Sequence, residues 1–120
     1  MKNLEAQHQS AYFARLALNE KKHPQLRWIF AVPNGGFRHK ATAARLRAEG
    51  VRSGIADICI PIPTKHYHGA WIELKIAPNK PTEAQKAFLE AMSNAGYFAA
   101  VAWSVDDLIE MTENYLGVRL

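Results

Sequence analysis

The sequence of 120 residues contains a single cysteine and no apolar run long enough to cross a membrane. A spanning helix needs about 18 or more consecutive apolar residues, and the first residues are polar and charged where a signal peptide would be apolar. One cysteine cannot form an internal disulfide. These absences exclude a disulfide scaffold and predict a cytosolic protein without a membrane partner.

Internal repeats, low-complexity tracts and Gly/Ser linkers are also absent, so the chain reads as one continuous unit. Apolar residues make up 48% of the sequence and charged residues 22%, which is typical of a soluble globular protein. A chain of this length can bury one hydrophobic core but not two. We therefore expect one domain that spans residues 1–120.

Several reactive residue types occur without the partners that catalysis or metal binding would require. Cys59 lies between Ile58 and Ile60, which favours a buried core residue over a nucleophile. His66 and His68 are too few ligands for a structural zinc site, so we expect exposed loop histidines. No phosphate-binding P-loop and no Ser/His/Asp arrangement is present. The three tryptophans lie in or beside predicted strands, where we expect core positions: Trp28, Trp71 and Trp103.

The net charge of +4 is modest, but its placement is uneven. Between Arg38 and Arg52 the chain carries five basic residues and one acidic residue, Glu49. This difference of four equals the whole net charge. These basic residues are Arg38, Lys40, Arg45, Arg47 and Arg52. Such a segment indicates either a polyanion partner or a solvated helix face.

Hydrophobic periodicity predicts alternating helices and strands. Helices are expected over residues 3–21, 39–49 and 84–95, and a last one is opened by Ser104. Strands are expected over residues 27–32, 56–62, 70–76 and, as a buried strand, 97–103. This order predicts an α/β fold with a small mixed sheet flanked by helices.

Three of the predicted helices carry a stripe directed to the core. In the first helix the stripe is polar at one end and apolar at the other, with Glu5, Tyr12 and Leu16. In the second, Ala43, Ala44 and Leu46 can face the core. In the third, the apolar spacing comprises Ala84, Ala87, Phe88, Ala91, Met92 and Ala95.

Two carboxylates, Asp57 and Glu73, interrupt otherwise apolar strands. A carboxylate in such a place is unfavourable unless it is paired, hydrogen-bonded or bound to a metal. Paired residues of an antiparallel hairpin have a constant index sum, and a turn centred near Lys65 gives a sum of about 130. Asp57 and Glu73 then lie opposite each other in neighbouring strands.

Lys75 follows two residues after Glu73 and therefore emerges on the same face. Two carboxylates and a backbone carbonyl are suitable ligands for Mg²⁺ or Mn²⁺, and the ammonium group can orient the attacking water or assist its deprotonation. The alternative is a buried ion pair of Lys75 with Asp57 or Glu73 that has no catalytic role.

These motifs occur in the order that is found in a known protein family. Gly54-Ile55-Ala56-Asp57, then Ile72-Glu73-Leu74-Lys75 and then Gln85-Lys86 resemble the signature of the PD-(D/E)XK nuclease superfamily. Further matches are Glu5-x-x-x-Gln9, Pro33-Asn34-Gly35-Gly36, the approach from Gly50-Val51 to Gly54, and Gly96-Tyr97. Together they make the chain similar, from about Leu4 to Trp103, to the virus-type replication-repair nuclease (VRR-NUC) domain.

The resemblance implies a role for each matched residue. Asp57, Glu73 and the Leu74 carbonyl would bind Mg²⁺ or Mn²⁺, and Lys75 would position the attacking water. Glu5 would complete the site directly or through water, although the helix dipole also favours a glutamate in a first turn. Gln85, and less so Gln9, match family glutamines. Thr82-Glu83-Ala84-Gln85 is also a capping box, in which Gln85 would cap the third helix.

These inferences predict a metal-dependent DNA endonuclease in replication, recombination or repair. The basic residues would hold DNA phosphates, together with the loop residues Asn34, Gly35 and Gly36. Small stand-alone members of the family occur in phages and are similar to Holliday-junction resolvases, which implies a homodimer that cleaves branched DNA in a bacterial or phage-infected cell. The alternatives are a non-catalytic nucleic-acid-binding module and a restriction-type or RNA-directed nuclease with the same core.

Overall fold

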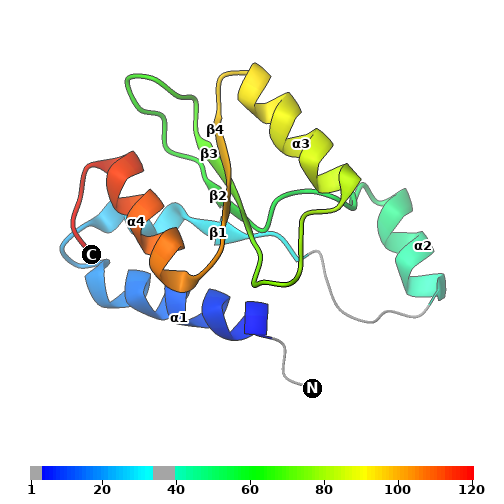
Figure 1. Ribbon diagram of the computed structural model, residues 1–120, viewed down its shortest axis with the longest axis horizontal. Helices are drawn as coiled ribbons and strands as arrows, with labels where there is room; N and C mark the ends of the chain where they lie inside the picture. Colours follow the sequence, from blue (N-terminus) through cyan, green and yellow to red (C-terminus); the bar gives the residue numbers. More distant parts are fainter. Residues whose placement is uncertain (1–3, 34–39) are drawn as a thin grey trace.

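The computed structural model describes residues 4–33 and 40–120, which form an α/β fold. The elements, in chain order, are α1 (Leu4–Asn19), the 3₁₀ helix η1 (Pro24–Trp28), β1 (Phe30–Ala31), α2 (Lys40–Ala48), β2 (Ile58–Ile60), β3 (Ala70–Leu74), α3 (Glu83–Asn94), β4 (Phe98–Ala102) and α4 (Val105–Leu116). Within this part of the chain the strands form one sheet in the order β1-β2-β3-β4. Its pairs are antiparallel except β3 and β4, which are parallel. The predicted mixed sheet flanked by helices is confirmed (Figure 1).

One face of the sheet builds the hydrophobic core against α1 and α4. The buried side chains of this core come from alternate strand positions and from both helices, namely Ile58, Ile60, Ile72, Leu74, Tyr12, Leu16 and Leu108. Tyr12 also shares a hydrogen bond of 2.8 Å with Thr112 of α4, so its buried hydroxyl has a partner. The apolar end of the stripe predicted for the first helix is confirmed.

The opposite face of the sheet is covered by α3, on the side of β3 and β4. Trp71 of β3 meets Phe88 of α3 edge to face, with 5.1 Å between ring centroids. Of the stripe predicted for this helix, Phe88 and Met92 are half-buried, whereas the alanines of the stripe are exposed. The helix therefore covers this face only in part.

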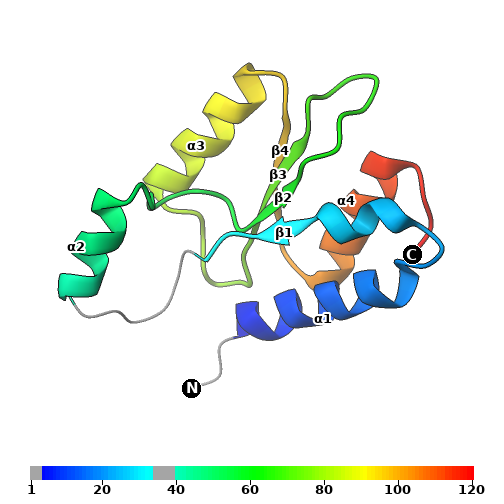
Figure 2. The same ribbon diagram turned by 180° about the vertical axis from the view of Figure 1, so that it is seen from behind.

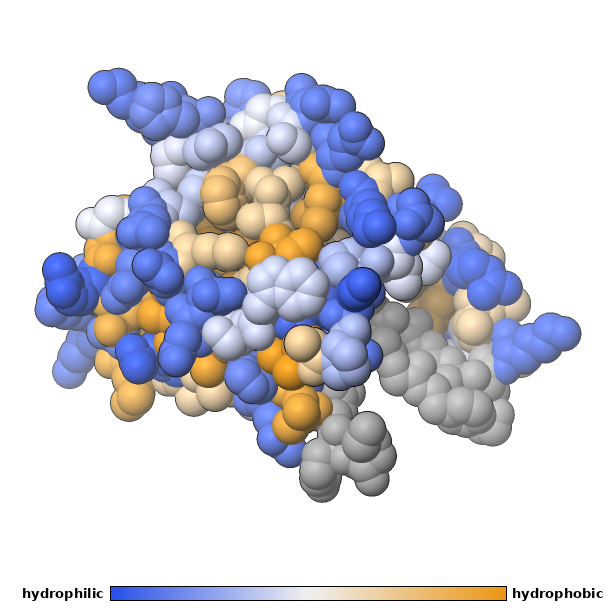
Figure 3. All heavy atoms as spheres, in the orientation of Figure 1, coloured by the Kyte–Doolittle hydropathy of each residue, from blue (hydrophilic) through white to orange (hydrophobic). Residues whose placement is uncertain are grey.

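The strand β4 lies at an edge of the sheet and is less buried than predicted. Phe98 to Val101 are half-buried and only Ala102 is fully buried. Figure 3 shows apolar atoms over β4, between α3 and α4, bordered by hydrophilic side chains. The expectation of a buried strand is wrong here because no further strand of the described chain pairs with β4.

Two tryptophans and α2 also depart from the predictions. Trp28 is 61% exposed and Trp103 45% exposed, whereas Trp71 is half-buried. Residues 24–28 form a 3₁₀ helix that begins at Pro24, so the strand expected over 27–32 is reduced to Phe30–Ala31. The helix α2 stands beyond α3, away from the core (Figure 2). No residue of α2 is fully buried, and the expectation that Ala44 faces the core is wrong.

The expectations for the remaining single residues hold. Cys59 is buried, and burial raises the pKa of its thiol to about 11, which excludes a ready nucleophile. His66 and His68 are exposed. In the described parts of the chain, no helix combines the length and apolar character needed to cross a membrane.

Candidate active site

The strand register places Asp57 and Glu73 opposite each other. Ile58 pairs with Ile72 and Cys59 with Trp71, which is the predicted index sum of 130. One step further along the same ladder, the Leu74 N–H donates a hydrogen bond of 2.8 Å to Asp57 Oδ2. The predicted register is confirmed, and both carboxylates lie on the face of the sheet that α3 covers only in part.

Glu73 is a buried acid, and only one of its two carboxylate oxygens contacts a cationic group of the described residues. Its side chain is 1% exposed, and Oε2 lies 3.4 Å from Lys75 Nζ. Among the residues that the structure describes, its second oxygen, Oε1, is buried without a hydrogen-bond donor, and only a proton shared with Asp57 would satisfy it. A buried acceptor of this kind normally has a partner, either from the protein, an ordered water or an ion. The ion pair with Lys75 therefore leaves half of the carboxylate's binding capacity unused.

Burial raises the pKa of both carboxyl groups, and the charge of Asp57 adds to the rise at Glu73. Burial, followed by the charge of Asp57, raises the pKa of Glu73 to about 7, while Lys75 opposes the rise. Burial also raises the pKa of Asp57, against the hydrogen bond from the Leu74 N–H. Two such carboxyls are disposed to bind a cation, because positive charge between them would favour both ionised forms.

A divalent cation fits the donor set at this point. Carboxylate oxygens are the ligands that Mg²⁺ and Mn²⁺ prefer, and Glu73 Oε1 is an unused one. Among the residues that the structure describes, no group of three acidic, histidine or cysteine side chains is assembled to hold a metal. The protein would supply the two carboxylates as its acidic core, and the role predicted for the Leu74 carbonyl stays a prediction.

Glu5 lies in the first turn of α1 and is held near this pair by a residue that sequence reasoning missed. Its Oε2 accepts a hydrogen bond of 3.1 Å from Asn79 Nδ2, and its charge is the smallest of the influences on the pKa of Asp57. Asn79 follows Lys75 in the loop that leads to α3. No signal in the sequence could have found this contact, because it joins residues 74 positions apart.

Gln85 forms the predicted capping box. The Gln85 N–H donates to Thr82 Oγ1 at 3.2 Å, and Gln85 Oε1 accepts from the Thr82 N–H at 2.8 Å. The side-chain oxygen of Gln85 is thus used to begin α3. Gln9 is half-buried, one turn after Glu5.

The basic residues divide into those that the structure describes and those that it does not. Lys40, Arg45, Arg47 and Arg52 are exposed on or beside α2, whereas Arg38, Asn34, Gly35 and Gly36 lie outside the described residues. Arg45 forms an exposed ion pair of 3.3 Å with Glu49. Such a pair adds little stability, so most of the positive charge of this segment faces solvent.

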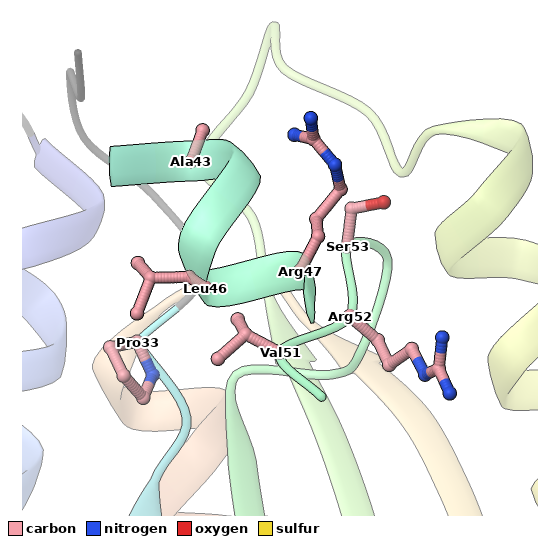
Figure 4. A pocket seen from close by; sticks show the side chains of 7 residues that line it. All are labelled: Pro33, Ala43, Leu46, Arg47, Val51, Arg52 and Ser53. Atoms are coloured by element: carbon pink, nitrogen blue, oxygen red, sulfur yellow. The ribbon is translucent and has the colours of Figure 1, made fainter. Parts of the chain in front are cut away.

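A pocket of about 160 Å³ lies between α2 and the turn that follows it. Leu46, Val51 and Pro33 lie together in this pocket, and the guanidinium groups of Arg47 and Arg52 extend away from them (Figure 4). These apolar contacts attach the base of α2 and leave both cations free for a phosphate partner.

Gly54 connects this basic turn to the carboxylates. Its φ of +82° is a conformation that side chains rarely adopt, and a Cβ at this position would lie 2.8 Å from Ala84 Cβ in α3. Only glycine allows the chain to pass this close to the helix before it enters Asp57 and β2. The glycine of the predicted approach motif therefore has a packing reason.

Comparison with known proteins agrees with this geometry. A family model described as the VRR-NUC domain matches residues 4–106. A solved structure described as a "VRR_NUC domain protein" is similar to this chain, with 26% sequence identity and a TM-score of 0.76. The match covers 99% of this chain and 93% of that one. No curated protein matches the chain.

Proposed function

The chain belongs to the VRR-NUC family of nucleases, and from this premise we propose that it is a Mg²⁺- or Mn²⁺-dependent endonuclease that hydrolyses phosphodiester bonds in DNA. The observation that carries the proposal is the unpartnered, buried Oε1 of Glu73 beside Asp57. A purely structural ion pair with Lys75 would leave this oxygen without a function. A divalent cation would give it a ligand role.

In this proposal each residue has one task. Asp57 and Glu73 would hold the cation, with the carbonyl of Leu74 and with Glu5 directly or through water. The bound cation would supply the positive charge that activates water and neutralises the scissile phosphate. Lys75, whose side chain is only 12% exposed, would donate a hydrogen bond from Nζ that orients the attacking water. Gln85 caps α3 through its side-chain oxygen, and any contribution to catalysis would come from its side-chain amide.

The basic segment around α2 would bind the DNA backbone beside this site. Arg47 and Arg52 are exposed and form no ion pair with another described residue, which suits phosphate contacts without base readout. Because each phosphate contact releases condensed counterions, we expect affinity to fall steeply as salt is added. Replacement of both arginines by glutamine should reduce this salt dependence, and unchanged dependence would contradict the role.

We propose further that the protein acts as a homodimer on branched DNA, such as a Holliday junction. Two sites on one dimer would cut two strands of a junction. The edge strand β4, with its half-buried apolar residues, supports self-association, because unpaired strand edges and exposed apolar area favour protein contacts. Sedimentation at several concentrations tests this, and a monomer throughout would contradict it.

The direct test is cleavage of labelled linear duplex, flap, fork and four-way junction DNA, with an RNA duplex beside them. Each is incubated with Mg²⁺, with Mn²⁺ and with chelator. We expect metal-dependent cleavage with preference for a branched DNA, and its loss in Asp57→Asn. The matched control Asp106→Asn changes an exposed aspartate of α4 and should cleave normally.

Titration of Mg²⁺ or Mn²⁺ into the same variants separates binding from turnover. We expect Asp57→Asn to lose metal affinity and Asp106→Asn to retain it. Unchanged metal affinity of Asp57→Asn would remove Asp57 from the site. Binding of DNA without cleavage of any substrate would favour the non-catalytic module.

A further inference from the structure

Two aromatic side chains of the N-terminal half are exposed, one of them Trp28, for which the sequence predicts a core position. Trp28 is 61% exposed and Phe30 is 45% exposed, while Ile29 between them is only 6% exposed. Ile29 has an extended backbone, with φ −73° and ψ 132°. Because side chains alternate along an extended chain, Phe30 points away from the core that Ile29 enters, and Trp28, the last residue of η1, is exposed as well.

The strand pairing places Phe30 on the same sheet face as the carboxylates. Phe30 pairs with Cys59, and directly opposed residues of an antiparallel pair share a face. Cys59 is two residues after Asp57, and the Val32 N–H donates a hydrogen bond of 2.7 Å to the Asp57 carbonyl. Alternate residues of a strand are about 7 Å apart, so Phe30, two residues before Val32, continues a row with Asp57, and Trp28 precedes it at the end of η1.

The surroundings of this row fit a nucleic acid. The strand β1 lies at the edge of the sheet opposite β4, and α3 covers the part of this face over β3 and β4. The Arg27 guanidinium lies 5.0 Å from the centre of the Trp28 ring. It places positive charge beside the tryptophan ring and leaves more than half of the tryptophan surface exposed. An aromatic surface beside a cation accepts a stacked base together with its phosphate.

We propose that Trp28 and Phe30 form a stacking platform for unpaired nucleotides that adjoin the scissile phosphate. The inference rests on the proposed function, since the carboxylates define where that phosphate lies. A base inside a duplex is stacked on its neighbours and cannot lie on a protein ring, whereas a base in a single-stranded arm can. Among the branched substrates, the platform thus favours one with a single-stranded arm, such as a flap or fork, over a four-way junction whose arms are fully paired.

The test is DNA binding in chelator, which requires no cleavage. Fluorescence anisotropy compares a flap that has a single-stranded arm with a blunt duplex of equal length. Phe30→Ala and Trp28→Ala should each weaken flap binding at least about fivefold and leave duplex binding unchanged. The conservative variants Phe30→Tyr and Trp28→Phe should retain flap binding. Tyr67→Ala, which removes a 39% exposed aromatic near the start of β3, is the matched control and should bind the flap normally.

The outcomes separate this inference from the proposed function. Selective loss of flap binding supports the platform even if no DNA is cleaved in Mg²⁺, in which case only the catalytic proposal fails. Equal loss on flap and duplex, no loss on either, or no preference of the unchanged protein for the flap overturns the platform. Dissociation of a dimer by Phe30→Ala or Trp28→Ala, seen by sedimentation, also overturns it and makes the row a protein interface.

Discussion

Neutralising Glu73 should stabilise the metal-free protein above neutral pH. Burial and the charge of Asp57 raise the pKa of Glu73 from 4.5 to about 7. A group whose pKa is higher in the folded state binds its proton more tightly there, so its stabilising effect is complete below about pH 4.5. It is lost as the pH rises to about 7. At about 1.4 kcal/mol for each pH unit, the loss is roughly 3 kcal/mol.

Glu73→Gln keeps the size of the side chain and removes this titration. Urea denaturation in chelator between pH 5 and pH 8 gives the free energy of unfolding of both proteins. The difference between them reports the pair of Glu73 and Asp57, because these two carboxyls affect each other and the other titrating groups act on both proteins. We expect the variant to gain up to roughly 3 kcal/mol over the unchanged protein as the pH rises, reduced by the lost contact with Lys75. Glu83→Gln, which alters a 92% exposed glutamate in an ion pair with Lys86, should show no such gain.

Metal binding gives a second test of Glu73, through its effect on the free energy of unfolding. A cation that binds only the folded state adds about 2.7 kcal/mol at a concentration of one hundred times Kd. Mg²⁺ or Mn²⁺ at pH 8 should therefore restore most of the stability that the unchanged protein loses, and should do little for Glu73→Gln. Parallel pH profiles of the two proteins would refute the buried, repelled state of Glu73, and equal stabilisation by metal would refute its ligand role.

Three further substitutions, and a fourth as a control, test the elements around the site. Gly54→Ala should lower the free energy of unfolding by about 1–3 kcal/mol, because of the positive φ and the contact with Ala84. Gly50→Ala has a positive φ but open space and should lose less by the same urea assay. Gln85→Ala should cost about 1 kcal/mol by loss of the cap with a normal cleavage rate, and a reduced rate at unchanged stability would instead place it in the site. Lys75→Met should slow cleavage at least about a hundredfold while Mn²⁺ still raises Tm, and loss of that rise would make Lys75 structural.

The features that the sequence predicts correctly are local or repeat with a fixed period. The pairing of Asp57 with Glu73 follows from one turn position and the constant sum of an antiparallel ladder. The capping box of Gln85 is contained in four consecutive residues. The face of α1 that carries Tyr12 and Leu16 follows from the helical period. Each depends on spacing alone, so a single sequence suffices.

The features that the sequence does not predict depend on which other helices and strands pack against a given residue. Trp28 and Trp103 are large aromatic residues of a type that is often buried in a core. Their exposure depends on which strands lie at the sheet edges and where the helices end. The contact between Asn79 and Glu5 joins distant residues and has no pattern. Ala44 of α2 has helical spacing, yet α2 stands away from the core that would cover it.

The core and the candidate site are two consequences of one register. Ile58 and Ile72 are completely buried on the face that α1 and α4 cover, and because side chains alternate, Asp57 and Glu73 must emerge on the other face. A slip of one residue between β2 and β3 would carry isoleucines to the partly open face and separate the carboxylates. The apolar area buried by the isoleucines therefore fixes the geometry of the acids. Stability of the core is a condition for assembling this site, and Leu74 joins the two, because its side chain lies in the core while its N–H donates to Asp57.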